Sequence, residues 1–175
     1  MPPARLPVRI SRSTTASRSD LRLKELSSMG RPDPALLDLT RYPFRHVITT
    51  RFADIDPNRH INNVAMAAAF EDARARFDVA QGHLETMGHM RTMIAANHID
   101  YVGEAHYPAP LDMYVGVLDL GRSSWTLACL ATQDGRACAF ARAVLVGTVD
   151  GKAAPLPDSF RAGLDRMRVR RDAAA

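Results

Sequence analysis

The sequence predicts an α+β protein in which a curled antiparallel sheet of about five strands wraps around one long central helix. Two observations lead to this prediction. A run with helical spacing extends from residue 63 to about residue 81, and its first half is apolar on every face. Beyond it the apolar period changes to two, and four strand-like segments follow. A helix that is apolar all round must be covered on most sides, and a curled sheet provides such a cover.

The chain is expected to contain one main domain, over residues 33–157. Residues 1–32 are rich in Ser, Arg, Thr and Pro and have little apolar periodicity, so we expect a flexible basic N-terminal tail. An organellar transit peptide or a misassigned start codon would give a similar composition. Asp33 and Pro34 then predict the N-cap and first residue of a short helix that ends near Leu39.

A first strand is expected from Phe44 to Phe52, ahead of the long helix, because this segment is β-branched and alternating. The four later strands are expected at Met93–Val102, Leu111–Leu120, Ser123–Gln133 and Arg136–Val149. Asp134-Gly135, between the last two, is a strong hairpin signal. The last strand is apolar on both faces, which predicts burial on both sides.

One face of the long helix is expected to carry Met66, Phe70, Ala73, Phe77 and Ala80 into the core. A second helix, followed by a tail, is expected over residues 158–175. Asp158 is its predicted cap, and the same spacing argument gives its inner face as Phe160, Leu164 and Met167.

The composition is that of an ordinary globular protein, with 46% hydrophobic and 24% charged residues among 175. No stretch approaches the ~20 apolar residues of a membrane span, and no apolar segment follows the basic start as in a secretory signal. Cys129 and Cys138 do not have a metal-ligand or redox spacing. We therefore expect packed thiols, a cytoplasmic protein and no membrane partner.

Much of the basic excess lies at the two ends of the chain, with five arginines between residues 1 and 22 and five between residues 161 and 171. Such ends are typical of solvated tails, of nucleic-acid contacts, or of attraction to an anionic group such as a coenzyme A phosphate. The first 32 residues are too short and too poor in apolar periodicity for a helix-turn-helix. We therefore expect no nucleic-acid partner.

The segment Asp56-Pro57-Asn58-Arg59-His60-Ile61-Asn62-Asn63 is the most specific candidate site. It places a carboxylate, an imidazole and three side-chain amides at a predicted strand-to-helix junction. Backbone N–H groups at a helix N-terminus are unpaired and carry a partial positive charge. A carboxylate beside donors that hold a carbonyl oxygen is suited to acyl-transfer chemistry.

On these residues the chain resembles the hotdog-fold thioesterases, over roughly residues 44–157. The resemblance rests on the segments Arg51–Pro57, His60–Asn63, Phe70–Arg74, Tyr107–Leu111 and Pro155–Pro157. The first is similar to the 4-hydroxybenzoyl-CoA thioesterase branch, and the fuller pattern from Asp56 to Asn63 is similar to the acyl-ACP thioesterase branch. Many acyl-CoA members have glycine before the histidine, where this chain has Arg59.

The resemblance implies that Asp56 is the catalytic carboxylate and that the backbone N–H of Asn63 holds the thioester oxygen. Asn58 and His60 are expected to orient the carboxylate or the attacking water. Glu71, about two turns along the same helix, is the reserve catalytic carboxylate, because some members of the family use a helix glutamate.

Structural roles remain open for most of these residues. Asp56 is also suited to a turn beside a proline, and His60 to holding its loop together. Asn62 or Asn63 is expected to cap the helix. Glu71 is placed to pair with Arg74 at i+3.

Two further residues of the loop, Asn62 and Arg59, are expected to contact the substrate. Asp54 is expected to be structural.

No other motif suggests a different chemistry. The histidines outside the motif lack a metal spacing such as His-Glu-x-x-His, and Gly121-Arg122-Ser123-Ser124 does not match a Gly-x-Ser-x-Gly elbow. We therefore expect neither a metal nor a cofactor, with coenzyme A or acyl carrier protein present only as part of the substrate.

The predicted function is hydrolysis of acyl-CoA or acyl-ACP. The alternatives are a non-catalytic acyl-CoA-binding module and a hotdog enzyme of the enoyl-thioester hydratase type. The resemblance also implies a homodimer or homotetramer with its sites at the subunit boundary.

Overall fold

A computed structural model describes residues 31–170 of the chain. The expected basic tail over residues 1–32 lies almost wholly outside the described residues, as do the last five residues. The described part is α+β, with an antiparallel sheet in the strand order β1-β3-β4-β5-β2. The strands are β1 (Phe44–Ile48), β2 (Arg91–Tyr101), β3 (Leu111–Leu120), β4 (Ser124–Gln133), β5 (Arg136–Val149) and the short β6 (Lys152–Ala153), which pairs with β5.

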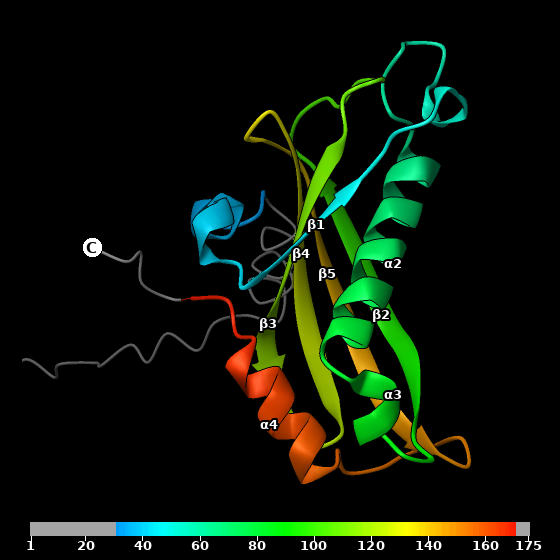
Figure 1. The fold of residues 1–175 in the computed structure, drawn as a ribbon, viewed down its shortest axis with the longest axis vertical. Helices are drawn as coiled ribbons and strands as arrows, with labels where there is room; N and C mark the ends of the chain where they lie inside the picture. Colours follow the sequence, from blue (N-terminus) through cyan, green and yellow to red (C-terminus); the bar gives the residue numbers. More distant parts are fainter. Residues whose placement is uncertain (1–30, 171–175) are drawn as a thin grey trace, which may run out of the picture. The chain divides into compact units, whose positions relative to one another are not determined.

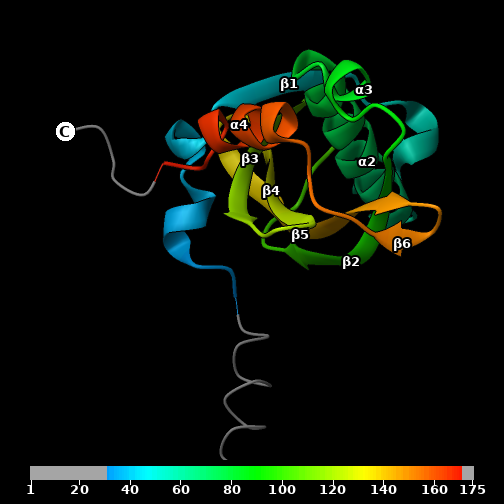
Figure 2. The same cartoon turned by 90° about the horizontal axis from the view of Figure 1, so that it is seen from below.

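The long helix α2 (Asn63–Ala80) lies against the concave face of the curled sheet (Figures 1 and 2). Phe70, Ala73 and Phe77 on its inner face are fully buried, and the ring of Phe44 meets that of Phe77 edge-on at 5.6 Å. The predicted fold class is therefore confirmed. Ala80 is the exception on the predicted inner face, because it lies exposed at the last turn.

The opposite face of the sheet has a second, smaller core. Two short 3₁₀ helices, η1 (Pro34–Leu37) and η2 (Leu39–Arg41), pack over it together with Val169 from the C-terminal segment. Phe140 and Leu130 are completely buried beneath them. This cover explains why β4 and β5 are apolar on both faces.

Helix α4 (Asp158–Arg166) follows the sheet, and a short helix, α3 (His83–Thr86), follows α2 without having been predicted. The predicted capping role of Asp158 is wrong, since Asp158 is the first helical residue and Pro157 occupies the cap position. Phe160 and Leu164 are buried, as the helical spacing predicts. Asp33 caps η1 by accepting a hydrogen bond from Ala35 N–H, as expected.

The first strand is shorter than predicted. It pairs with β3 from Phe44 opposite Val115 to Ile48 opposite Leu111, and β3 begins at Leu111. Pro110, just before it, has no N–H to continue the ladder. The chain therefore leaves the sheet after Ile48 and forms the 3₁₀ turn η3 (Phe52–Asp54).

Within residues 31–170 the outer side of α2 is not covered, contrary to the expectation that its first half is buried on most sides. Val64 is 72% exposed and Val79 69% exposed, because the sheet reaches only the inner face. Edge strand β2 is likewise exposed along most of its length. Within residues 31–170 no helix is both long and apolar enough to cross a membrane.

Candidate active site

The loop from Asp56 to His60 is closed by the Asp56 carboxylate. Its Oδ1 accepts hydrogen bonds from the backbone N–H groups of Asn58 at 2.8 Å and His60 at 3.1 Å. The backbone adds two more bonds, from Asp56 N–H to the His60 carbonyl and from Arg59 N–H to the Asp56 carbonyl, each 2.9 Å. Asp56 therefore has the turn-forming role that the adjacent proline suggested. Its second oxygen, Oδ2, has no hydrogen-bond partner among the described residues.

Arg59 takes the place of the glycine that precedes the histidine in many acyl-CoA thioesterases. Its φ of 65° lies in the left-handed region, which glycine adopts without steric cost and other residues adopt rarely. The loop therefore keeps the conformation that glycine would allow, and the Arg59 side chain is exposed.

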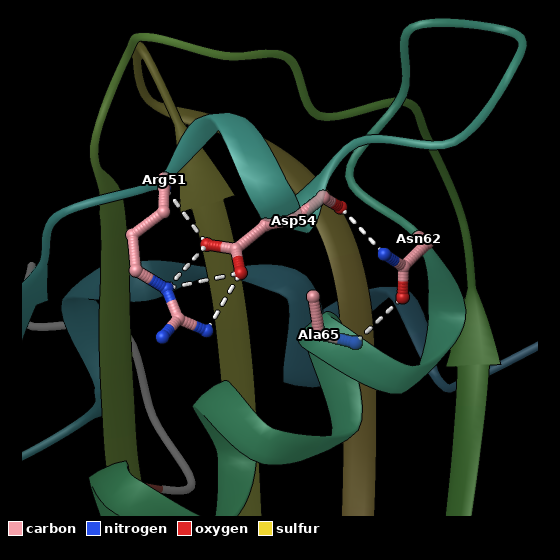
Figure 3. A network of polar contacts seen from close by, with 4 residues as sticks. All are labelled: Arg51, Asp54, Asn62 and Ala65. Atoms are coloured by element: carbon pink, nitrogen blue, oxygen red, sulfur yellow. Dashed lines mark hydrogen bonds and ion pairs between the residues drawn. The ribbon is translucent and has the colours of Figure 1, made fainter.

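The start of α2 is held by Asn62, as Figure 3 shows. The Asn62 Oδ1 atom accepts a hydrogen bond from Ala65 N–H at 2.8 Å, which makes Asn62 the N-cap. Its Nδ2 donates to the Asp54 carbonyl at 2.8 Å. With Asn62 in the cap position, the N–H of Asn63 is the first of the helix and has no acceptor within residues 31–170. Asn63 therefore presents a free donor at the positive end of the helix.

Asp54, whose carbonyl accepts the Asn62 side chain, is itself held by Arg51 (Figure 3). Its carboxylate accepts the Arg51 backbone N–H at 2.8 Å and Nη2 of the Arg51 guanidinium at 2.8 Å. These hydrogen bonds from Arg51, chiefly those of its side chain, hold the pKa of the Asp54 carboxyl below its ordinary value. Asp54 is thus a buried structural carboxylate, as the sequence suggested.

A cavity of about 310 Å³ opens beside the first turns of α2. Ile61, Ala65 and Asp54 contribute to its lining, and Asp56 does not. Asn63 is not part of this lining either, so within the described residues the cavity contacts neither the candidate carboxylate nor the candidate oxyanion donor.

Glu71 lies farther along α2 and is ion-paired with Arg74, as the i+3 spacing predicted. The Arg74 side chain is 4% exposed and that of Glu71 63% exposed. The Glu71 carboxylate therefore has a partner on its own helix, whereas Asp56 Oδ2 has none among the described residues. No contact within residues 31–170 joins Glu71 to Asp56 or to Asn63.

His60 has two neighbours that sequence spacing did not indicate. Its Nε2 lies 3.4 Å from Oε2 of Glu104, and Nε2 of His106 lies 3.6 Å from the same oxygen. The two imidazole rings meet edge-on with centroids 5.0 Å apart. The three donor atoms lie within 4.8 Å of one another, so this cluster is a group of described residues that can hold a cation. Sequence spacing gave no signal of this cluster, because His60 lies more than forty positions before Glu104 and His106.

Comparison with known proteins assigns the family. Residues 50–164 match the thioesterase-like superfamily, and this chain belongs to it. A thioesterase from Thermus thermophilus, whose structure holds coenzyme A and zinc, is 30% identical. That match covers 74% of this chain and 96% of the other, with a TM-score of 0.65.

Two further relatives agree with this assignment. A structure described as a predicted thioesterase from Bacillus stearothermophilus is 29% identical over 71% of this chain and 96% of its own, with a TM-score of 0.65. The uncharacterized protein YsmA of Bacillus subtilis strain 168 is 27% identical over 120 residues, which are 65% of this chain and 82% of that protein. The predicted hotdog thioesterase resemblance is confirmed, and the family supports thioester hydrolysis as the general reaction.

Proposed function

We propose that this protein hydrolyses acyl thioesters of coenzyme A or acyl carrier protein, with Asp56 as the catalytic carboxylate and the Asn63 N–H as the oxyanion donor. The observation that supports this most directly is the free Asn63 N–H at a capped helix start. The relative from Thermus thermophilus, solved with coenzyme A, favours an acyl-CoA substrate.

The proposed reaction adds water across the C–S bond. Asp56 Oδ2 takes a proton from water, and the water oxygen attacks the acyl carbon. The Asn63 N–H stabilises the negative carbonyl oxygen, a contribution typically worth ~10²–10³ in rate. The C–S bond then breaks, and the leaving thiolate receives the proton. Direct attack by the carboxylate, followed by hydrolysis of the anhydride, gives the same products.

Asn58, His60, Asn62 and Arg59 have supporting roles in this proposal. Asn58 and His60 fix Asp56 Oδ1 through their backbone N–H groups, which leaves Oδ2 for chemistry. Asn62 sets the first turn of the helix. Arg59, exposed at the tip of the loop, is available to the anionic groups of the carrier.

We also propose that two copies of the chain pair through β2 and the outer face of α2. Exposed apolar side chains lie on both elements, among them Val64, Met93, Ile94 and Tyr101. An open edge strand with apolar side chains is normally paired or covered. Pairing there would also bring a second chain close to the helix start, since the Tyr101 hydroxyl donates to the Asn63 carbonyl at 3.2 Å. The Asp56 site would then be completed by the partner.

Light scattering after size exclusion tests this assembly. We expect at least twice the mass of one chain, and a lower mass for Ile94→Lys. Val47→Lys alters an exposed apolar residue on β1, at the opposite edge of the sheet, and should leave the mass unchanged. A single-chain mass for the unaltered protein would refute the pairing.

The activity test offers a panel of acyl-CoAs and acyl-ACPs and detects the released thiol. Asp56→Asn retains an oxygen for the N–H groups of Asn58 and His60 but removes the carboxylate. We expect its activity to fall by at least ~10²-fold while its thermal stability stays close to that of the unaltered protein. Glu71→Gln is the matched control and should remain active.

An active Asp56→Asn enzyme would refute the assignment, and loss of activity in Glu71→Gln alone would move it to the helix glutamate. If the unaltered protein binds acyl-CoA but hydrolyses none, it is a binding module. If it instead hydrates an enoyl thioester, the reaction class is different.

The two cysteines support the expected cytoplasmic location. Cys129 and Cys138 are both buried and unbridged, which is typical of a reducing compartment.

A further inference from the structure

The cluster of His60, Glu104 and His106 has the dimensions of a metal site. The distances from Glu104 Oε2 to the two Nε2 atoms are 3.4 and 3.6 Å, and one ligand atom from each of the three residues lies within 4.8 Å of the other two. A point equidistant from three atoms so placed lies roughly 2.0–2.4 Å from each, which spans the usual Zn–N and Zn–O bond lengths. The two distances to Glu104 Oε2 are also close to the ~3.4 Å between neighbouring ligands of a tetrahedral zinc ion.

The backbone of each of these residues is held in place. His60 exchanges hydrogen bonds with Asp56, whose Oδ1 accepts the His60 N–H. Gln133, which is 6% exposed, accepts the His106 N–H and donates to the His106 carbonyl, both at 2.8 Å. The Glu104 carbonyl accepts from the buried Cys138 thiol at 3.2 Å. The backbone of each ligand residue is therefore fixed by hydrogen bonds, which lowers the entropic cost of arranging the side chains around an ion.

The two histidines are also joined directly. His60 and His106 form an isolated antiparallel bridge, and Ile61 N–H donates to the Ala105 carbonyl at 2.7 Å. An ion at the cluster would therefore tie the Asp56–His60 loop to the segment that leads into β3. Solvent reaches the cluster, since the side chains of His60, His106 and Glu104 are 34%, 51% and 65% exposed.

We propose that His60, Glu104 and His106 bind one divalent transition-metal cation of the zinc type. Two imidazoles and one carboxylate are a donor set that suits zinc, with the remaining position left to water. This inference revises the sequence-based expectation of no metal, and it does not depend on thioester hydrolysis.

The test measures metal binding directly on the full-length, untagged protein after treatment with a chelator. Zn²⁺ is titrated by calorimetry, and Co²⁺ by the visible absorption that appears when it enters a low-coordinate site. We expect one equivalent of either ion to bind and the melting temperature to rise with Zn²⁺. His106→Ala and Glu104→Gln should each weaken binding by at least ~100-fold, since each removes a direct ligand and loss of a supporting residue alone costs ~10–100-fold.

A matched control is the exposed pair of His98 and Asp100, which are 2.9 Å apart and have no third donor within residues 31–170. His98→Ala should leave the Zn²⁺ affinity unchanged. Because Glu104 is exposed, Glu104→Gln should fold normally, and its metal-free melting temperature verifies this. The proposal is overturned if neither ion binds stoichiometrically, or if His98→Ala weakens binding as much as His106→Ala. Loss of thioesterase activity plays no part in the outcome.

Discussion

Replacement of Asn62 by alanine provides a direct test of how the helix start is stabilised. Asn62 makes two side-chain hydrogen bonds, one to Ala65 N–H and one to the Asp54 carbonyl. Loss of an N-cap costs ~1 kcal/mol. The Asp54 carbonyl keeps a second donor, the Asn62 N–H, so loss of the amide donor costs only ~0.5–1 kcal/mol. The expected total is about 2 kcal/mol, or a fall in melting temperature of roughly 4–8 °C for a chain of this size.

Urea unfolding followed by fluorescence measures this loss. Trp125, the single tryptophan, is 1% exposed in β4 and so reports unfolding of the sheet. All variants are compared at one protein concentration, because the stability of an oligomer depends on it.

Asn62→Ser is the matched control, since it keeps a capping oxygen but loses the amide donor. We expect it to lose only ~0.5–1 kcal/mol. The reasoning fails if Asn62→Ala is as stable as the unaltered protein, or if the serine variant is as unstable as the alanine variant.

Three other outcomes are expected. The pKa of Asp54 is lowered in the folded state, so the ionised carboxylate stabilises the fold above its unfolded pKa of about 3.8, and this stabilisation is lost as the pH falls further. The difference in unfolding free energy between the unaltered protein and Asp54→Asn should therefore narrow from pH 7 to pH 3. A constant difference would contradict the ion pair with Arg51. Burial raises the pKa of the Cys129 thiol to about 12 and also raises that of Cys138. Neither thiol should therefore react with a disulfide reagent at pH 8 until the protein is unfolded. Rapid labelling of the folded protein would show that the core is open to the reagent. Ala65→Leu narrows the cavity beside the helix start and should shift the acyl-CoA preference towards shorter chains, whereas an unchanged chain-length profile would mean that the acyl group lies elsewhere.

The local parts of the fold were predictable from the sequence because their signals come from neighbouring residues. Asp134 and Gly135 form the predicted hairpin turn, with φ values of 52° and 74° that suit this dipeptide. Asn62 caps α2 through a bond that reaches only three residues along the chain. β3 and β5 have their predicted bounds, because turn residues flank them.

Features that depend on sheet pairing were not predictable in this way. β1 stops at Ile48 because β3, its partner, begins at Leu111. Among the described residues the outer side of α2 stays exposed because the sheet curls around only one side of it.

The sequence by itself determined the class of fold, the start of the long helix and the motif that identifies the family, since each depends on residues a few positions apart. Only the tertiary structure decided what surrounds that motif. It brought Glu104 and His106 to His60. Such contacts arise when paired strands bring distant segments together, and spacing along the chain carries no record of that pairing.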